Sequence, residues 1–149
     1  PYMKNLLVPV DFSPVTMTVL KQAENVSKCM GGKIWLIHVA APDPDFIGLN
    51  IGPQHVRDWR AEQLREEHRG IQKMAIELEE RGADVTPILV QGPSIQTILN
   101  EADKRKVEMI ILGSHGHGAL YSVLFGSVCE GILHKAKCPV MIVPADWPD

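Results

Sequence analysis

Residues 107–113 read VEMIILG, in which a short apolar run, residues 107–112, ends at a glycine. Continuous apolar runs of this kind are typical of strands that are covered on both faces, as in parallel sheets. Four other segments share this character, so the sequence predicts five buried strands. The other four are KNLLVPV at residues 4–10, KIWLIHV at 33–39, DVTPILV at 84–90 and PVMIVP at 139–144.

Helical patterns fill the intervals between these runs. A first helix is expected after Ser13 and Pro14, which form a typical cap and first-turn pair, and it ends at Gly31. A second helix is expected from about residue 55 to residue 81. Gly70 lies inside this second pattern and lowers its helical propensity.

Two shorter helices are expected later in the chain. One starts near Ser94, whose hydroxyl is a candidate cap, and the other runs from about residue 126 to residue 136. Because strands and helices alternate throughout, the predicted class is α/β, a five-stranded parallel sheet flanked by helices on both faces in a Rossmann-like arrangement. In such sheets, ligands bind at the carboxyl ends of the strands, near the point where the strand order reverses.

The bulk composition is that of an ordinary globular protein. The 149 residues are 45% hydrophobic and 22% charged, and a single domain spanning residues 1–149 is expected. The formal net charge of -3 lacks the basic excess of a nucleic-acid-binding protein, and no apolar run approaches the roughly 18 residues of a membrane span. No signal peptide is recognised, and the three cysteines match no zinc or redox spacing, so a cytoplasmic protein with free thiols is expected.

The residues that follow the fourth predicted strand are rich in glycine, and residues 113–128 read GSHGHGALYSVLFGSV. Gly113 and Gly116 can adopt a positive φ and let a ligand approach the main chain. Gly126 and Ser127 then open a helix, whose first amides lack intrahelical partners and lie at the positive end of the helix dipole. Such a helix start is suited to phosphate, although a tight connection between strand and helix explains the glycines equally well.

Two common phosphate-binding motifs are absent from this segment. No lysine precedes Ser127, as a Walker A loop would require. Tyr121 stands where a dinucleotide fingerprint would need a third glycine or an alanine. The segment therefore fits neither of these two nucleotide-binding classes.

The spacing Gly113-x-x-Gly116, then nine residues, then Gly126-Ser127 resembles the nucleotide loop of the ATP-binding subgroup of the universal stress protein family. The resemblance covers nearly the whole chain with the family's usual spacing. Its other segments are LVPVDFS at residues 7–13, His38-Val39, VEMIILG at 107–113 and AKCPVMIV at 136–143. The resemblance implies one universal-stress-protein-like domain with an adenine-nucleotide-binding architecture.

The resemblance also implies which residues contact an adenine nucleotide at the ends of the first and fourth strands. The main chain of Val39 would meet the adenine edge, and Asp11 would lie by the ribose or the phosphates. Ser13 is included in the site, although a helix cap is its simpler role. The base pocket would be lined by Pro9, Val10 and Leu112. The phosphates would be held by Gly113, His115 and Gly116 on one side and by Gly126, Ser127 and Val128 on the other.

One departure from the family pattern concerns His115, because many relatives carry arginine at this place. A neutral histidine donates one hydrogen bond and titrates near neutrality, whereas arginine is permanently charged. We therefore expect the affinity for nucleotide to rise as the pH falls from about 8 to about 6. His115 and His117 alone do not make a metal site, and a magnesium ion would instead arrive with the nucleotide phosphates.

Simpler structural roles compete with several assignments. Asp11 could bond a turn amide or cap the first helix, and Ser127 could be only a cap. His38 lies in a predicted strand and is expected to be a satisfied core histidine. Cys129 lies near the positive end of a helix, which can lower the pKa of a thiol, but a packed free cysteine is the simpler interpretation. Residues 40–54 are rich in proline and glycine and are expected to form a long loop.

The function that the resemblance implies is that of a stress-linked regulatory protein that binds ATP without rapid turnover. Two alternatives remain open at this point. One is a slow ATP hydrolase in which Asp11 orients a water or a metal, and the other is an interaction module that binds no nucleotide. The family commonly forms homodimers, and residues 139–144 would pair with a second copy if they form an edge strand.

Overall fold

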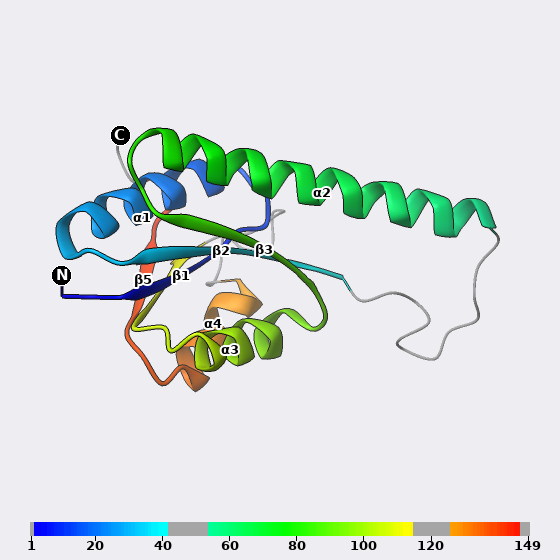
Figure 1. Ribbon diagram of the computed structural model, residues 1–149. Helices are drawn as coiled ribbons and strands as arrows, with labels where there is room; N and C mark the ends of the chain where they lie inside the picture. The colour runs from blue at the N-terminus through cyan, green and yellow to red at the C-terminus, as the bar shows by residue number, and fades with distance from the viewer. Residues whose placement is uncertain (1, 42–53, 115–125, 147–149) are drawn as a thin grey trace.

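Five parallel strands form one sheet in the computed structural model of this chain, in the order β3-β2-β1-β4-β5 (Figure 1). The structure describes residues 2–41, 54–114 and 126–146. The strands are β1 (Asn5–Pro9), β2 (Lys33–Ala40), β3 (Val85–Gln91), β4 (Met109–Gly113) and β5 (Val140–Val143). All five predicted strands are confirmed, each close to its expected bounds.

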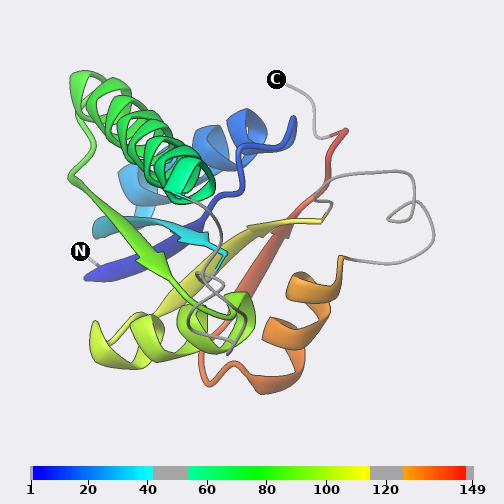
Figure 2. The ribbon, with the colours of Figure 1, turned by 90° about the vertical axis from the view of Figure 1, so that its right-hand side faces the viewer.

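Helices cover both faces of this sheet. They are α1 (Thr16–Met30), α2 (Gln54–Glu80), α3 (Ser94–Lys104) and α4 (Ser127–Lys135). Helices α1 and α2 lie on one face, and α3 and α4 lie on the other (Figure 1, Figure 2). The predicted α/β class, with a parallel sheet between two helical layers in a Rossmann-like arrangement, is therefore confirmed.

The side chains of each strand divide between two apolar cores, because successive residues of a strand point to opposite faces. On β1, Leu6 and Val8 pack on the side of α1 and α2, whereas Leu7 packs on the side of α3 and α4. All three side chains are 0% exposed. Burial on both faces is the physical reason why the strand sequences are apolar throughout instead of alternating.

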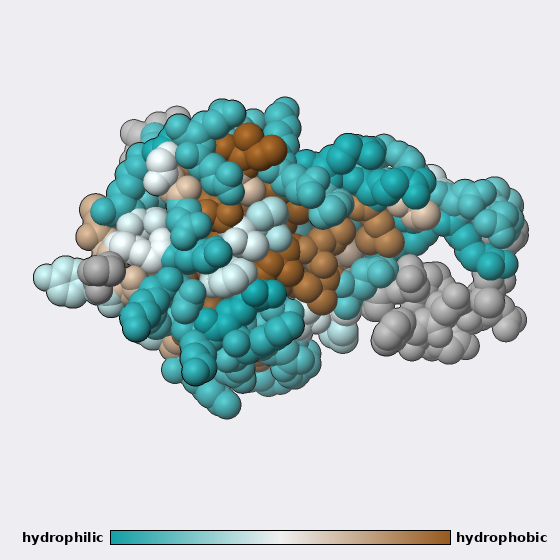
Figure 3. Space-filling view, viewed as in Figure 1, coloured by the Kyte–Doolittle hydropathy of each residue, from teal (hydrophilic) through white to brown (hydrophobic). Residues whose placement is uncertain are grey.

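The two edges of the sheet are β3 and β5. Figure 3 shows apolar side chains gathered along β3, between the hydrophilic surfaces of α2 and α3. Residues 86–90 of this strand are half-buried rather than buried, as expected for an edge. The predicted pairing of residues 139–144 with a second copy requires that they form an edge strand, and β5 is at the edge of the sheet.

Helix α2 is a continuous helix of 27 residues, and its amino-terminal part extends beyond the sheet (Figure 1). Gly70 does not interrupt it. A Cβ built on Gly70 would lie 3.2 Å from Cε1 of Phe12, so the glycine lets an aromatic ring pack closely against the helix. The contact with Phe12, which is far from Gly70 in the sequence, thus explains why a glycine stands within this helix.

The two predicted serine caps are wrong. Helix α1 begins at Thr16, and the Ser13 carbonyl, not its hydroxyl, accepts a hydrogen bond from the Thr16 amide at 3.0 Å. Helix α3 has Pro93 at its N-cap position, so Ser94 is its first helical residue and makes no cap. Neither serine occupies the N-cap position, which is held by Val15 in α1 and by Pro93 in α3, and neither N-cap makes a side-chain capping bond.

Candidate functional site

The order of the strands reverses at β1, which is the third strand of the sheet and the first in the sequence. It pairs with β2 through Pro9 and Ile37, and with β4 through Leu7 and Ile110. Because all three strands are parallel, the carboxyl ends of β1 and β4 lie side by side. This is the topological switch point at which open α/β sheets bind ligands.

The chain that leaves β1 makes a tight turn at this end of the sheet. The Val10 amide donates to the Ile37 carbonyl at 2.8 Å, which extends the contact with β2 by one residue. Asp11 is exposed, and its Oδ1 accepts a hydrogen bond from the Ser13 amide at 2.9 Å. The turn-amide alternative for Asp11 is therefore confirmed, and the same bond leaves the carboxylate at the surface of the switch point.

The end of β4 is packed closely against the start of α1. Leu112 is buried, and a Cβ built on Gly113 would lie 2.7 Å from Cγ1 of Val15. Gly113 is not among the glycines with a positive φ, so the conformational freedom of glycine is not the reason for this residue. The reason for glycine at this position is the space that the Val15 side chain occupies.

The start of α4 lies directly beside the end of β4. The Gly126 amide donates to the Ser114 carbonyl at 3.4 Å, and the Ser114 amide donates to the Val143 carbonyl at 2.9 Å. Two segments separated in the sequence, residues 112–114 and residues 126–128, are thus held together. This contact brings the predicted glycines Gly113 and Gly126 to the same end of the sheet.

The first amides of α4 have no acceptor within the helix. The first intrahelical bond runs from the Glu130 amide to the Gly126 carbonyl at 3.0 Å, so the amides of residues 127–129 precede the helical ladder. Gly126 is the N-cap and Ser127 is the first helical residue, so the alternative in which Ser127 is only a cap is wrong. Unpartnered amides at the positive end of a helix dipole can bind an anion.

Three buried hydroxyls at this end of the sheet lack hydrogen-bond partners within the described chain. Ser13 follows β1 and is 3% exposed, Thr16 begins α1 and is 3% exposed, and Ser114 follows β4 and is 6% exposed. A buried hydroxyl without a partner costs about 1–3 kcal/mol, so each is a candidate contact for a bound molecule. Ser114 was not among the residues predicted from the sequence, although its position directly after Gly113 was a signal.

Most residues of the predicted site lie at the carboxyl ends of neighbouring strands. Val39 is the penultimate residue of β2, and it lies two residues beyond the partner of Pro9. His115 and Gly116 lie outside the described residues, as do His117 and residues 42–53 of the predicted loop. The residues that the structure brings to this end are Pro9, Val10, Asp11, Ser13, Val39, Leu112, Gly113, Gly126, Ser127 and Val128.

The comparison with known families agrees with this architecture. The model of the universal stress protein family matches residues 3–144. The chain belongs to the universal stress protein family. This universal stress protein is 30% identical over 142 residues to Universal stress protein MJ0531 of Methanocaldococcus jannaschii, an alignment that covers 94% of this chain and 81% of the relative. It is 29% identical to Universal stress protein MJ0577 of the same organism, over 94% of each chain.

Solved structures share the fold of this universal stress protein. The structure of MJ0577 superposes with a TM-score of 0.81 at 27% identity and covers 97% of both chains. A universal stress protein in complex with cAMP matches with a TM-score of 0.70 at 17% identity, covering 98% of this chain and 100% of that one. A universal stress protein from Archaeoglobus fulgidus in complex with dAMP matches with a TM-score of 0.68 at 18% identity, covering 95% and 98%. At these identities, the last two comparisons show the fold alone.

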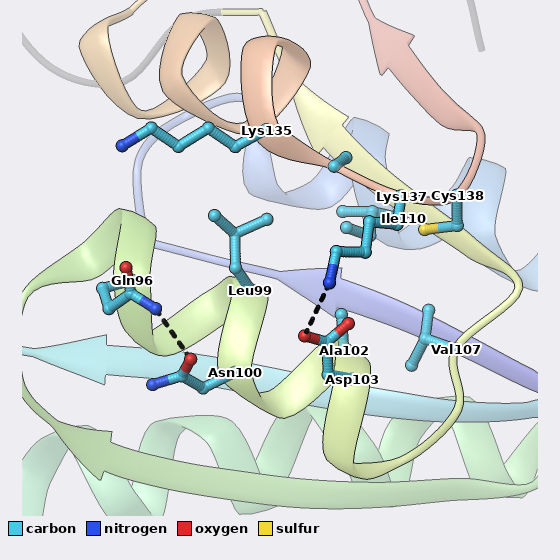
Figure 4. Close-up of a pocket in the computed structure, with 11 residues that line it drawn as sticks. Gln96, Leu99, Asn100, Ala102, Asp103, Val107, Ile110, Lys135, Lys137 and Cys138 are labelled. Carbon is cyan, nitrogen blue, oxygen red and sulfur yellow. Dashed lines mark hydrogen bonds and ion pairs between the residues drawn. The ribbon is translucent and has the colours of Figure 1, made fainter.

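A pocket of about 220 Å³ lies away from the switch point of this universal stress protein, between α3, the last turn of α4 and the segment that enters β5 (Figure 4). Leu99 and Ile110 contribute apolar side chains to it, and Cys138 contributes a thiol. The Lys137 ammonium lies 3.9 Å from the Asp103 carboxylate within it. No residue of the predicted nucleotide site lines this pocket.

The thiol near the start of α4 is packed in the core. Cys129 is 4% exposed, and burial raises the pKa of its thiol. The interpretation as a packed free cysteine is confirmed, and the alternative of a pKa lowered by the helix start does not hold, because burial disfavours the charged thiolate.

Across residues 2–41, 54–114 and 126–146, no three His, Cys, Asp or Glu side chains gather closely enough to hold a metal ion. Within the same part of the chain, no helix combines the length and apolar character needed to cross a membrane.

Proposed function

We propose that this universal stress protein is an adenine-nucleotide-binding regulatory protein of the stress response, and that it binds ATP between the ends of β1 and β4. One observation carries the proposal. The first amides of α4, which have no acceptor within the helix, lie beside the end of β4, through the contact between Gly126 and Ser114, at the switch point of the sheet. An anion site adjoining an apolar strand end is suited to a ligand with a base at one end and phosphates at the other.

Each side of the proposed site has a chemical role. The amides of Ser127 and Val128 would donate to phosphate oxygens, and the hydroxyls of Ser13 and Ser114 would gain the partners they lack within the described chain. The Asp11 carboxylate, exposed beside them, would face the ribose or a magnesium ion carried by the phosphates. Magnesium is therefore proposed to come with the nucleotide rather than to have a site of its own.

Structural relatives support an adenine nucleotide as the ligand. Proteins of the same fold and family have been solved in complex with cAMP and with dAMP. Both ligands carry adenine and a single phosphate group. The proposal that this chain prefers ATP rests on the helix start, which offers more than one amide to a longer phosphate chain.

Slow hydrolysis of ATP is a second candidate function, favoured by the exposed Asp11 carboxylate at the switch point. In this case the carboxylate would orient a water or the magnesium ion. Phosphate release at saturating ATP measures it directly. A rate that Asp11→Asn abolishes would support hydrolysis, and a rate no higher than that of buffer would exclude it and leave a binding protein.

Calorimetric titration with ATP, ADP and AMP in the presence of magnesium tests the proposed function, with GTP as a control for the base. We expect ATP to bind more tightly than AMP, because more of its phosphate oxygens can reach the amides at the start of α4. We also expect ATP to bind more tightly than GTP. An absence of binding by every nucleotide would overturn the proposal and favour an interaction module.

We further propose a cytoplasmic homodimer that pairs through β5. The three cysteines are free, which fits a reducing compartment. The Pro139 carbonyl accepts a bond from Ile110 of β4, and the Val143 carbonyl accepts one from Ser114, directly after β4. The alternate residues Val140 and Ile142 therefore direct their main-chain groups outward. At the opposite edge, Pro87 occupies an outward position of β3 and has no amide hydrogen to donate. This hinders β3 from pairing with another strand, whereas β5 has no such proline at its outward positions.

A further inference from the structure

We propose that His38 is a positioning residue for the nucleotide site, because it holds the β1–α1 turn (residues 10–15) in place from β2. The inference rests on the proposed function only in its last step, the effect on nucleotide affinity. His38 itself is 8% exposed and is placed to contact the turn rather than a ligand.

A hydrogen bond joins His38 to the first residue of the turn. Its Nδ1 lies 2.8 Å from the Val10 carbonyl oxygen. Because a carbonyl oxygen can only accept, Nδ1 carries the hydrogen and donates it. The Val10 amide already donates to Ile37, so both main-chain groups of Val10 are held by neighbouring residues of β2.

Phe12 is the second point at which the turn is held. Its φ is 61°, in the left-handed region that a bulky side chain rarely adopts, and such a conformation persists only where the surroundings hold it. The Phe12 ring packs against the His38 ring at 4.5 Å between centroids, and it also lies against Gly70 of α2. His38 and Gly70 together therefore stabilise the strained residue.

Helix α2 also contacts the far side of the imidazole. Nε2 of His38 lies 3.5 Å from Oε2 of Glu67, and this buried oxygen has no hydrogen-bond partner within the described chain. The ring is thus enclosed by Val10, Phe12 and Glu67. These contacts leave the imidazole one orientation, with Nδ1 toward the turn.

Asp11 lies between the two residues that His38 holds. Val10 is fixed by its carbonyl and Phe12 by its ring, so the direction of the Asp11 side chain follows from both. The hydrogen bond from the Ser13 amide to the Asp11 carboxylate then fixes the position of Ser13, and with it the position of the buried Ser13 hydroxyl. His38 therefore determines where the turn presents its polar groups to a nucleotide, although it does not touch the nucleotide itself.

Two variants separate positioning from packing. The side-chain amide of asparagine reaches the place of Nδ1, and that of glutamine reaches the place of Nε2. His38→Asn therefore keeps a donor for the Val10 carbonyl, whereas His38→Gln loses it and bonds Glu67 instead. His68→Gln, at an exposed position of the same helix as Glu67, is the matched control. Each variant is measured by calorimetric titration with ATP, by thermal unfolding and by the amide NMR signals of residues 11–13.

We expect His38→Gln to bind ATP about tenfold more weakly than His38→Asn, which corresponds to the loss of one hydrogen bond to a buried carbonyl. The signals of residues 11–13 should move further in His38→Gln, and His68→Gln should change neither measurement. Equal affinities for the two His38 variants would overturn the inference, as would an imidazole whose Nδ1 carries no hydrogen by nitrogen NMR.

A failure of the proposed function gives a different result. In that case the parent protein binds no ATP, and the amide signals alone decide the inference. Larger movement of residues 11–13 in His38→Gln than in His38→Asn supports the positioning role of His38. Equal movement in both variants contradicts it.

Discussion

The side chain of Val15 occupies the space that a side chain on Gly113 would need. A Cβ built on Gly113 would lie 2.7 Å from Cγ1 and 3.1 Å from Cγ2 of Val15. Valine is stiff at χ1, so it cannot turn away at low cost. The end of β4 and the start of α1 are therefore packed together at the proposed nucleotide site.

Gly113→Ala is expected to destabilise the protein by about 1–3 kcal/mol, because the added methyl group overpacks this contact. Urea denaturation of the parent and the variant measures the change in the free energy of unfolding. Val15→Ala in the same chain should recover part of the loss, since it removes both Val15 methyl groups and leaves the Val19 methyl group at 3.1 Å. Strictly additive effects of the two substitutions would contradict the contact.

The strands were predictable because the two-sided burial of a parallel sheet leaves a direct mark on the sequence. Leu6, Leu7 and Val8 face alternate sides, yet all must be apolar. The helix starts were less predictable, because a serine before a helix can cap it or lie in a turn made by other groups. At Ser13, the turn is held by the Asp11 carboxylate, which accepts from the Ser13 amide, and by the Ser13 carbonyl, which accepts from the Thr16 amide. No local sequence pattern distinguishes a serine in such a turn from a serine that caps a helix.

Parts of the site depended on contacts between distant residues. The spacing of Gly113 and Gly126 located the strand end and the helix start correctly. The reason for Gly113 was not predictable, because Val15 is far from it in the sequence. For the same reason, the role of Gly70 became clear only when the fold placed Phe12 against it.

Acid should destabilise the protein through Glu24, which is buried on α1. Burial raises the pKa of this carboxyl, but hydrogen bonds from Arg81 and Lys28 outweigh burial and hold it below its usual range. A folded-state pKa below the unfolded value means that the unfolded chain binds more protons. The stabilisation is therefore present above the unfolded pKa and is lost as the pH falls through the folded one.

The pH dependence of urea denaturation measures this linkage. Glu24→Gln should lower the stability by about 1 kcal/mol near pH 7, a value reduced by the exposure of Arg81, and should flatten the acid limb below about pH 5. Glu62→Gln is the control, since Arg65 and Arg69 also lower the pKa of Glu62 but the group is exposed. An unchanged acid limb in Glu24→Gln would show that another carboxylate carries the effect.

The three thiols should differ strongly in reactivity. Cys29 is exposed and Cys129 is buried. Burial raises the pKa of both Cys129 and Cys138, and the Asp103 carboxylate raises that of Cys138 further. Near pH 7.5, a thiol reagent should therefore modify one cysteine quickly in the native protein, and Cys29→Ser should remove the fast phase. A fast phase that survives this substitution would be inconsistent with the burial of the other two.

The proposed dimer is tested by molar mass in solution. Ile142→Pro removes an outward donor of β5 while leaving in place the bonds of the Pro139 and Val143 carbonyls with Ile110 and Ser114. Light scattering at micromolar concentration should give a dimer for the parent and a monomer for the variant. Circular dichroism of the variant checks that the fold is kept. A monomeric parent protein would contradict the pairing.

The position of the phosphates at the start of α4 is tested most directly by titrating ATP into Gly126→Arg beside the parent protein. Gly126 has φ of -53° and ψ of 153°, which other residues also adopt, so the backbone should accept the substitution. Leu133→Arg adds the same charge at an exposed position of the same helix and is the control. We predict that the parent and Leu133→Arg bind ATP, and that Gly126→Arg folds but does not bind. Equal binding by all three proteins would contradict a phosphate site at this helix start.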